Sequence, residues 1–351
     1  MPEMLTYLEA AVKAGASDIF IVSGWPVAFK VGGKITHADD TLVMPDRANG
    51  LVSSLYTLAN RSIDVFVENG DDDFSVSIPN LSRFRVNTFR QRGSMASVIR
   101  VVKFELPDYR ELSIPDEVMR IAEKTNGLVL VTGAAGSGKS TTLACIIDSI
   151  NSTRNSHIIT LEDPIEFLHR NKLSIVSQRE VGTDTDGYLT ALRASLRQAP
   201  NVILLGEMRD FETIRIAMTA AETGHLVIST LHTVGAVNTI DRIIDAFPPN
   251  QQQQIRVQLS MVLQSVVSQQ LIPTVEGGLV PAFEIMHLNS SVRNLIRESK
   301  IHQIDFVIQS SAAEGMMSID DSVIALFKQG RISREIAIKY AANPEQAERR
   351  L

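Results

Sequence analysis

The hydrophobic positions of this chain follow two patterns, and the change from one to the other lies near residue 118. Before it, helical spacing over Met4–Gly15 gives way to short segments in which apolar and polar residues alternate, the pattern of half-buried strands. After it, apolar runs alternate with amphipathic segments, which is typical of a mostly parallel α/β sheet. We therefore expect an α+β domain over 1–102, a linker over the proline-containing stretch 103–117, and an α/β domain over 118–351.

The N-terminal pattern predicts a small sheet. Strands are expected at Asp18–Ser23, Val27–Val31, Lys34–Thr36 and Phe74–Ile78, with turns at Gly32-Gly33 and at Asp71-Asp72-Asp73. The stretch "RFRVNTFRQRGSMASVIRVV" predicts two more strands joined through Gly93-Ser94. Alternation along the first of these puts Phe84, Val86 and Thr88 on one face and Arg83, Arg85 and Asn87 on the other.

Apolar runs predict the central strands of the second domain. They are Leu128–Thr132, His157–Leu161, Asn201–Leu205 and His225–Thr230. Helical spacing predicts an amphipathic helix over Ser140–Asn151, with Leu143, Ile146, Ile147 and Ile150 on its apolar face. A second amphipathic helix is expected over the whole of 251–271, and the remainder from about 288 to 351 is expected to be helical with polar loops.

A glycine-rich segment lies between the first of these strands and the helix that follows it. The segment matches G-x-x-x-x-G-K-[ST] in full and consists of Gly133, Ala134, Ala135, Gly136, Ser137, Gly138, Lys139 and Ser140, followed by Thr141. Its backbone N–H groups would point at phosphate oxygens, Lys139 would reach the β- and γ-phosphates, and the Ser140 hydroxyl would bind Mg²⁺. A chance glycine turn is disfavoured by the flanking strand and helix, so we expect ATP or GTP binding.

Acidic residues follow two further apolar strands. "HIITLEDPIEF" ends with Glu162 and Asp163 and continues to Glu166, and "NVILLGEMRD" ends with Glu207. In an open α/β sheet the carboxyl ends of the strands border the ligand crevice, and hydrolysis needs acids near the attacking water and near Mg²⁺. Gly206 stands where most nucleotide hydrolases carry an aspartate. Either Glu207 supports Mg²⁺ through a water molecule, or the acids after the first strand share this role. Taken singly, Glu162 or Asp163 is equally well explained as a cap of the next segment.

Two histidines flank the last central strand in "AETGHLVISTLHT". His232 follows the strand at the edge suited to sensing a γ-phosphate, and a structural role explains it equally well. His225 precedes the strand and is also explained by a hydrogen bond without chemistry. Neither histidine shows metal-ligand spacing, and the one cysteine, Cys145, is expected to be a buried apolar residue of the helix after the glycine loop.

Composition narrows the class of protein. The 351 residues are 44% hydrophobic and 21% charged, as in an ordinary folded protein, and are enough for two domains with cores. A net charge of −6 argues against broad nucleic-acid binding. The first residues lack the features of a signal peptide, and no apolar run approaches the ~20 residues that span a bilayer, so we expect a cytoplasmic protein without membrane insertion.

With these residues together, the chain resembles the secretion ATPase superfamily of type II secretion and type IV pili over nearly its whole length. The resemblance rests on the glycine loop, "TLEDPIEF", "ILLGEMRD", "AETGHLVISTLHT" and "RFRVN". It implies a PAS-like N-terminal domain, a RecA-like motor domain with a helical C-terminal part, a homo-hexameric ring and ATP bound between the two domains of one subunit. Gly206 is then characteristic of the superfamily.

The resemblance also implies roles for individual residues. In this superfamily arginines of the N-terminal domain contact the phosphates, and the matching positions are Arg85 and Arg100, for which a solvated strand face is the other explanation. Water activation and Mg²⁺ support belong to Glu166 and Glu207, of which we favour Glu166 as general base. Ala134 and Ala135 replace the usual Pro-Thr, at positions that contribute backbone.

Within the superfamily, the sequence indicates the branch that retracts pili. The chain starts at the PAS-like domain and has no four-cysteine zinc element, both of which distinguish it from assembly and secretion ATPases. "SVRNLIRE" at 291–298 is similar to the AIRNLIRE stretch of retraction ATPases, with Ser291 and Val292 as departures. The implied partners are an inner-membrane platform protein of the pilus and other pilus ATPases.

Other functions fit the sequence less well. An accessory retraction ATPase and an ATPase of a related secretion system are the nearest alternatives. A nucleic-acid translocase would need a basic channel or aromatic stacking positions, whereas only 5% of residues are aromatic. A small-molecule kinase would have no use for the N-terminal arginines, and a regulatory module would have no need of Glu162, Glu166 and Glu207.

Overall fold

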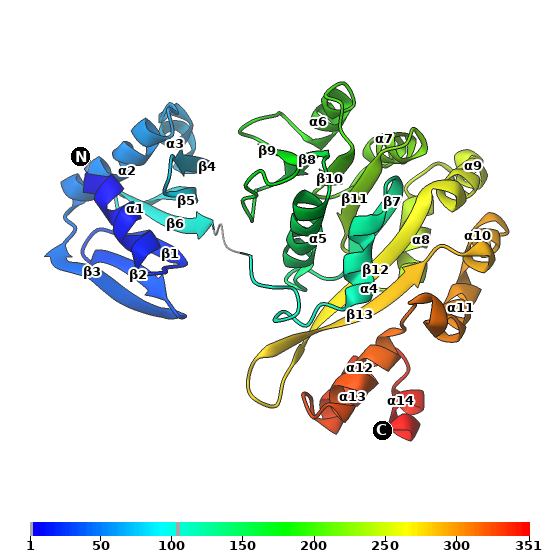
Figure 1. Ribbon diagram of the computed structural model, residues 1–351. Helices are drawn as coiled ribbons and strands as arrows, with labels where there is room; N and C mark the ends of the chain where they lie inside the picture. Colours follow the sequence, from blue (N-terminus) through cyan, green and yellow to red (C-terminus); the bar gives the residue numbers. More distant parts are fainter. Residues whose placement is uncertain (1–2, 103–105) are drawn as a thin grey trace. The chain divides into compact units, whose positions relative to one another are not determined.

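The computed structural model describes residues 3–102 and 106–351, which fall into two compact units (Figure 1). The first unit holds 3–102 and the short segment 165–168, and the second holds 106–164 and 169–351. Of the predicted linker, 103–105 lies outside the described residues. Its remainder belongs to the second unit, where Leu106, Tyr109 and Leu112 pack against buried residues of that unit.

The first unit is a six-stranded antiparallel sheet with helices on one face. Its elements are α1 (Glu3–Lys13), β1 (Asp18–Ile21), β2 (Pro26–Val31), β3 (Lys34–Leu42), α2 (Pro45–Leu58), α3 (Asp64–Asn69), β4 (Asp71–Ile78), β5 (Ser82–Gln91) and β6 (Ser94–Val102). The strand order is β3-β2-β1-β6-β5-β4. The predicted alternation in β5 is confirmed, because Phe84, Val86 and Thr88 are fully buried under the helices.

The acidic run Asp71-Asp72-Asp73 is not the turn that its composition predicts. It forms the start of β4, paired with β5, and the turn before it is made by Gly70 at φ 84°. Alternation buries only the middle aspartate, whose carboxylate pairs with Arg61 at 2.8 Å and 3.0 Å. A charged residue that finds a bidentate partner on a neighbouring element can occupy a core-facing strand position.

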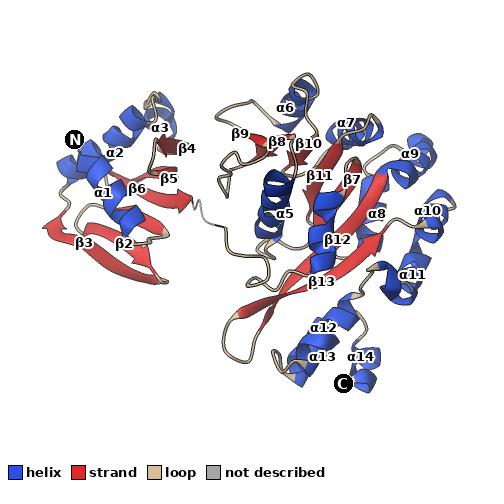
Figure 2. Cartoon of the chain, viewed as in Figure 1, coloured by secondary structure: helices blue, strands red, loops and turns tan. Residues whose placement is uncertain are grey.

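The second unit is built on a seven-stranded, mostly parallel sheet (Figure 2). Its strands are β7 (Gly127–Thr132), β8 (His157–Glu162), β9 (Ile175–Glu180), β10 (Val202–Leu205), β11 (Leu226–Leu231), β12 (Leu263–Pro273) and β13 (Leu279–His287). The order is β13-β12-β7-β11-β10-β8-β9, and only β13 is antiparallel to its neighbour. The four central strands lie close to their predicted bounds, and the α/β class is confirmed.

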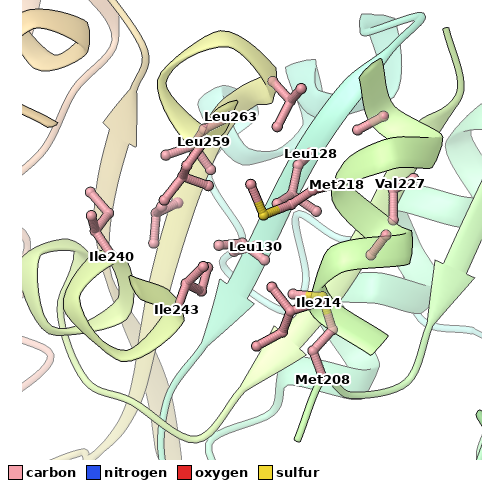
Figure 3. Packing of buried hydrophobic residues seen from close by; sticks show 14 of the residues in the cluster. Leu128, Leu130, Met208, Ile214, Met218, Val227, Ile240, Ile243, Leu259 and Leu263 are labelled. Atoms are coloured by element: carbon pink, nitrogen blue, oxygen red, sulfur yellow. The ribbon is translucent and has the colours of Figure 1, made fainter. Parts of the chain in front are cut away.

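Helices cover both faces of this sheet. They are α4 (Asp116–Met119), α5 (Lys139–Thr153), α6 (Tyr188–Ser195), α7 (Phe211–Glu222), α8 (Ala236–Asp245) and α9 (Pro249–Val262). Successive residues of each parallel strand face opposite sides, so Leu128 and Leu130 pack under α7, α8 and α9 (Figure 3), whereas Val129 and Val131 pack under α5. Cys145 is buried on α5 as expected, and burial raises the pKa of its thiol to about 11.

The single helix predicted over 251–271 is wrong in its second half. Helix α9 ends at Val262, and the chain continues as strand β12. This strand pairs with β7 in parallel on one side and with β13 antiparallel on the other. The apolar spacing of Leu263, Val266 and Val267 fits a helical face, yet all three are buried because this strand is covered on both sides. Periodicity alone does not separate a fully buried strand from a helix.

The C-terminal part is helical, as expected. It comprises α10 (Ser290–Arg297), α11 (Ile304–Ser310), α12 (Ile319–Lys328), α13 (Arg334–Tyr340) and α14 (Pro344–Arg350). Helices α12 and α13 pack on the outer half of the β12–β13 pair through Ile272, Val280 and Ala282. Within the described residues, none of the helices is both long and apolar enough to cross a bilayer.

Candidate nucleotide site

Parallel pairing brings the carboxyl ends of four strands side by side in the second unit. In spatial order they are β7, β11, β10 and β8, and the residues that follow them are the glycine loop, His232, Gly206-Glu207 and Asp163. The register aligns Thr132 with Leu231, and Leu205 with both Ser229 and Leu161. Candidate site residues that are spread over about a hundred positions of the sequence therefore lie at one edge of the sheet. Open α/β folds bind their ligands at this edge.

The glycine loop between β7 and α5 has a conformation that depends on its glycines. Gly133, Gly136 and Gly138 have φ of 141°, 77° and 88°, a region that residues with a side chain rarely adopt. A Cβ on Gly133 would lie 2.2 Å from the carbonyl oxygen of Gln269. Ala134 and Ala135 are exposed, which agrees with a contribution from their backbone alone.

The interior of the loop is suited to a phosphate group. Lys139 is buried and donates from Nζ to the carbonyl oxygens of Gly133 and Ala134 at 2.8 Å and 2.9 Å, so its charge lies inside the loop. The buried Ser137 hydroxyl has no hydrogen-bond partner in the described structure. Helix α5 starts at Lys139 without a side-chain cap, which leaves its first N–H groups to a ligand. These features fit the predicted nucleotide.

Gln269 of β12 is a loop-supporting residue that the sequence reasoning missed. Its side chain is buried and its Oε1 accepts a hydrogen bond of 2.7 Å from the Thr142 hydroxyl on α5. Its Nε2 lies 2.8 Å from the position of a Cβ on Gly138. The loop is thus packed against β12 at Gly133 and Gly138. Because 251–271 was expected to be one helix, no sequence signal placed Gln269 here.

Glu207 is the centre of a charged group at the end of β10. Its carboxylate lies 2.6 Å from the Arg209 guanidinium through Oε1 and 3.5 Å from His232 Nε2 through Oε2. The Glu207 side chain is 12% exposed, whereas those of Arg209 and His232 are 78% and 58% exposed. The ion pair raises the pKa of Arg209 above its usual range. His232 and Glu207, predicted separately, are therefore brought together, and Arg209 joins them.

The acids of "TLEDPIEF" have different environments. Glu162 ends β8, and its Oε1 accepts from the Thr160 hydroxyl at 2.6 Å and from Gln178 Nε2 at 3.1 Å. Asp163 is exposed beside it, and Glu166 lies in the segment 165–168 that groups with the first unit. Among the residues that the structure describes, no three His, Cys, Asp or Glu side chains are close enough to hold a metal ion by themselves. A metal here would need oxygen ligands from a bound nucleotide as well.

His225 does not belong to this edge of the sheet. It lies just before β11, at the amino end of the strand, whereas the glycine loop follows the carboxyl end of β7. Its Nδ1 is 2.9 Å from the carbonyl oxygen of Ala220, and its backbone bonds to Ala220 and Gly127. His225 therefore joins the end of α7 to the sheet in this structure, and its inclusion among the catalytic candidates stays a prediction.

Arg85 and Arg100 of the first unit lie directly opposite each other on β5 and β6. Both side chains are exposed on the sheet face away from the helices. Arg100 Nε is held 3.2 Å from Asp18 Oδ1 on β1, the next residue in the same cross-strand row. The two arginines that the sequence singled out therefore lie side by side on the exposed face of the sheet in the first unit.

The chain is similar to known proteins over most of its length. The family model described as "Type II/IV secretion system protein" matches residues 3–320. The type IV pilus retraction ATPase PilT of Pseudomonas aeruginosa is 44% identical over 96% of this chain and 98% of its own length, and the type IV pilus ATPase PilU of the same organism is 38% identical over 95% and 87%.

A solved structure gives the same picture. The crystal structure of the pilus retraction motor PilT with bound ADP is 44% identical and has a TM-score of 0.89, with 99% of both chains covered. The similarity extends over both units. The chain therefore belongs to the family of type II/IV secretion system proteins.

Proposed function

We propose that this chain is an ATP-hydrolysing motor that drives the retraction of type IV pili. The observation that carries this proposal is the similarity to the PilT retraction ATPase along almost the whole of both chains. The charged group at the carboxyl edge of the sheet supports it, because a module that only binds nucleotide has no use for acids next to the loop.

The residues of the second unit divide the work as follows. The N–H groups of 133–140 and the Lys139 ammonium bind the phosphates, and Ser140 with Glu207 supports Mg²⁺, which supplies charge neutralisation when bound. His232 contacts the Glu207 carboxylate and so links the end of β11 to the phosphate end of the nucleotide. Arg209 holds the same carboxylate from the solvent side.

Three parts of this proposal rest on the family resemblance: the general base, the arginines that bind phosphate, and the assembly. Glu166 acts as the base that takes a proton from the attacking water, and Glu162 and Asp163 assist it. Arg85 and Arg100 bind phosphate oxygens, and Asp18 orients Arg100 for this purpose. The chain works as a homo-hexamer at the cytoplasmic face of the inner membrane, on a platform protein of the pilus and together with other pilus ATPases.

Phosphate release from ATP tests the enzymatic part. The wild-type protein should hydrolyse ATP in the presence of Mg²⁺, and Lys139→Ala and Glu166→Gln should each lower the rate by about 10²-fold or more, as expected for groups that stabilise or activate the reacting atoms. Glu222→Gln is the control, since this exposed side chain bonds only to Gln258 among the described residues. Hydrolysis that survives Glu166→Gln would reassign the base to Glu207.

The mass of the particle tests the assembly. With ATP and Mg²⁺ at working protein concentration, sedimentation should give six copies. A protein that stays monomeric under these conditions would rule out the ring.

A further inference from the structure

The residue after β10 is a glycine, Gly206, and its backbone conformation does not require one. Gly206 is not among the residues with positive φ. A Cβ on it would lie 2.6 Å from the hydroxyl oxygen of Tyr188, 3.3 Å from Cε1 of the same ring and 3.1 Å from the carbonyl oxygen of Leu161. The aspartate that most nucleotide hydrolases carry here would therefore meet Tyr188, whose hydroxyl occupies the space that its Cβ would need and would have to move.

Tyr188 is placed there by α6. It is the first residue of this helix, its ring packs against the core below β8 and β10, and its hydroxyl reaches the strand ends. Burial raises the pKa of this hydroxyl, and the carboxylates of Asp163, Glu207 and Glu162 raise it further, so the group keeps its proton.

We propose that the Tyr188 hydroxyl takes the place of the absent strand-end aspartate and, when nucleotide and Mg²⁺ are bound, donates a hydrogen bond to a water at the strand ends that carry Glu162 and Glu207. Tyr188 is then a positioning residue for the hydrolysis proposed above, on which this inference rests. The second unit alone supplies every group involved.

The chemistry of the site favours a neutral donor over a further acid. Three carboxylates already lie near the hydroxyl, and another negative charge beside them would repel them. A protonated phenol instead offers an O–H group, which a water oxygen can accept without a further negative charge at the site. Because the ring is fixed by the core, the direction of this donor is set before the nucleotide binds.

Tyr188→Phe tests the hydroxyl, because it keeps the ring and removes one oxygen. The thermal midpoint and the affinity for a fluorescent ADP analogue without Mg²⁺ should stay at wild-type values. The gain in ADP affinity that Mg²⁺ brings, and the rate of ATP hydrolysis, should each fall about fivefold, the loss expected for one hydrogen bond. If both stay unchanged while the wild type hydrolyses ATP, this inference is overturned and the proposed function stands; a wild type without hydrolysis would count against the proposed function itself.

A double-mutant cycle tests the packing. Gly206→Ala should slow hydrolysis strongly in the wild-type background, where the new Cβ meets the hydroxyl. It should do so much less in Tyr188→Phe, where contacts of 3.1 Å and 3.3 Å remain. Gly187→Ala is the matched control, since this neighbouring glycine has extended φ and nothing within 4 Å of its Cβ position. Equal effects of Gly206→Ala in both backgrounds would show that the hydroxyl does not fill this space.

Discussion

At the scale of single residues, the shape of the glycine loop depends on its own glycines and on strand β12, which packs against it. The loop sequence supplies the glycines, but the surface they approach is β12, and Gln269 meets Thr142 across 127 residues of chain. A motif read along the sequence predicts the ligand and says nothing of such a distant support. Gln269 and Tyr188 were missed for this reason, because each becomes significant only through a residue distant in sequence, Thr142 on α5 and Gly206 after β10. Arg209 was missed although its partner, Glu207, lies only two residues before it.

Gln269→Ala should weaken nucleotide binding. It removes the acceptor of the Thr142 hydroxyl and leaves a buried polar group unpaired, which costs about 1–3 kcal/mol. Part of this cost appears as an ADP affinity that is roughly fivefold lower, measured by titration of a fluorescent analogue. Gln270→Ala is the control, because the adjacent side chain points to the other face of β12 and is partly exposed. Equal losses in the two variants would contradict a specific role for Gln269.

At the scale of elements, hydrophobic periodicity predicted the four central strands and helix α5 of the second unit. The central strands and α5 are short apolar runs or one-faced helices, and their burial follows directly from that pattern. The pattern failed where tertiary context decides. Val266 and Val267 fit the helical stripe of α9, yet they form a strand because β7 offers them an unpaired edge. Helices α2 and α3 were not predicted. The Asp71-Asp72-Asp73 run forms the start of β4, where the buried Asp72 pairs with Arg61.

Helix α9 offers a direct test of where the core lies. Leu259 is fully buried against the sheet, and Met261, two residues on, is 45% exposed. Leu259→Ala should lower the free energy of unfolding of the second unit by about 2–5 kcal/mol, because it leaves a cavity. Met261→Ala should change it by only about 0.5 kcal/mol. Denaturant titration measures both, and similar losses would place the wrong face of α9 against the core.

The β12–β13 pair predicts a dependence of stability on pH. His287 Nδ1 lies 2.8 Å from the Ser265 hydroxyl, and burial, with Lys124 and Arg120, lowers the pKa of the imidazole. Below pH ~6.5 the unfolded chain binds the proton first, so stability falls as the pH drops through this range. We expect the loss of unfolding free energy between pH 7.5 and 5.5 to be smaller in His287→Asn than in wild type.

The exposed His302 provides the control for that comparison. His302→Asn should keep the wild-type pH dependence, since this exposed side chain is not part of the buried contact between His287 and Ser265. A His287→Asn protein that loses as much stability as the wild type on acidification would remove His287 as a source of the effect.

At the scale of the whole molecule, sheet topology explains why the candidate site is coherent. Because β7, β11, β10 and β8 are parallel and adjacent, four separate sequence motifs end at one edge. The sequence predicted that edge for Glu207 and His232, whereas His225, from the same motif, lies at the other end of the strand. Both placements follow from the bounds predicted for the strand, which the structure gives as Leu226–Leu231.

The central claim is that this site powers pilus retraction. Its most direct test is to replace Lys139 by alanine in the cells that make this protein and to follow labelled pili by fluorescence microscopy. The account predicts cells that still assemble pili but no longer shorten them, because Lys139 lies inside the loop that binds the phosphates. Retraction at the wild-type rate, or the loss of pili altogether, would contradict it, since the first makes the site dispensable and the second assigns the motor to assembly.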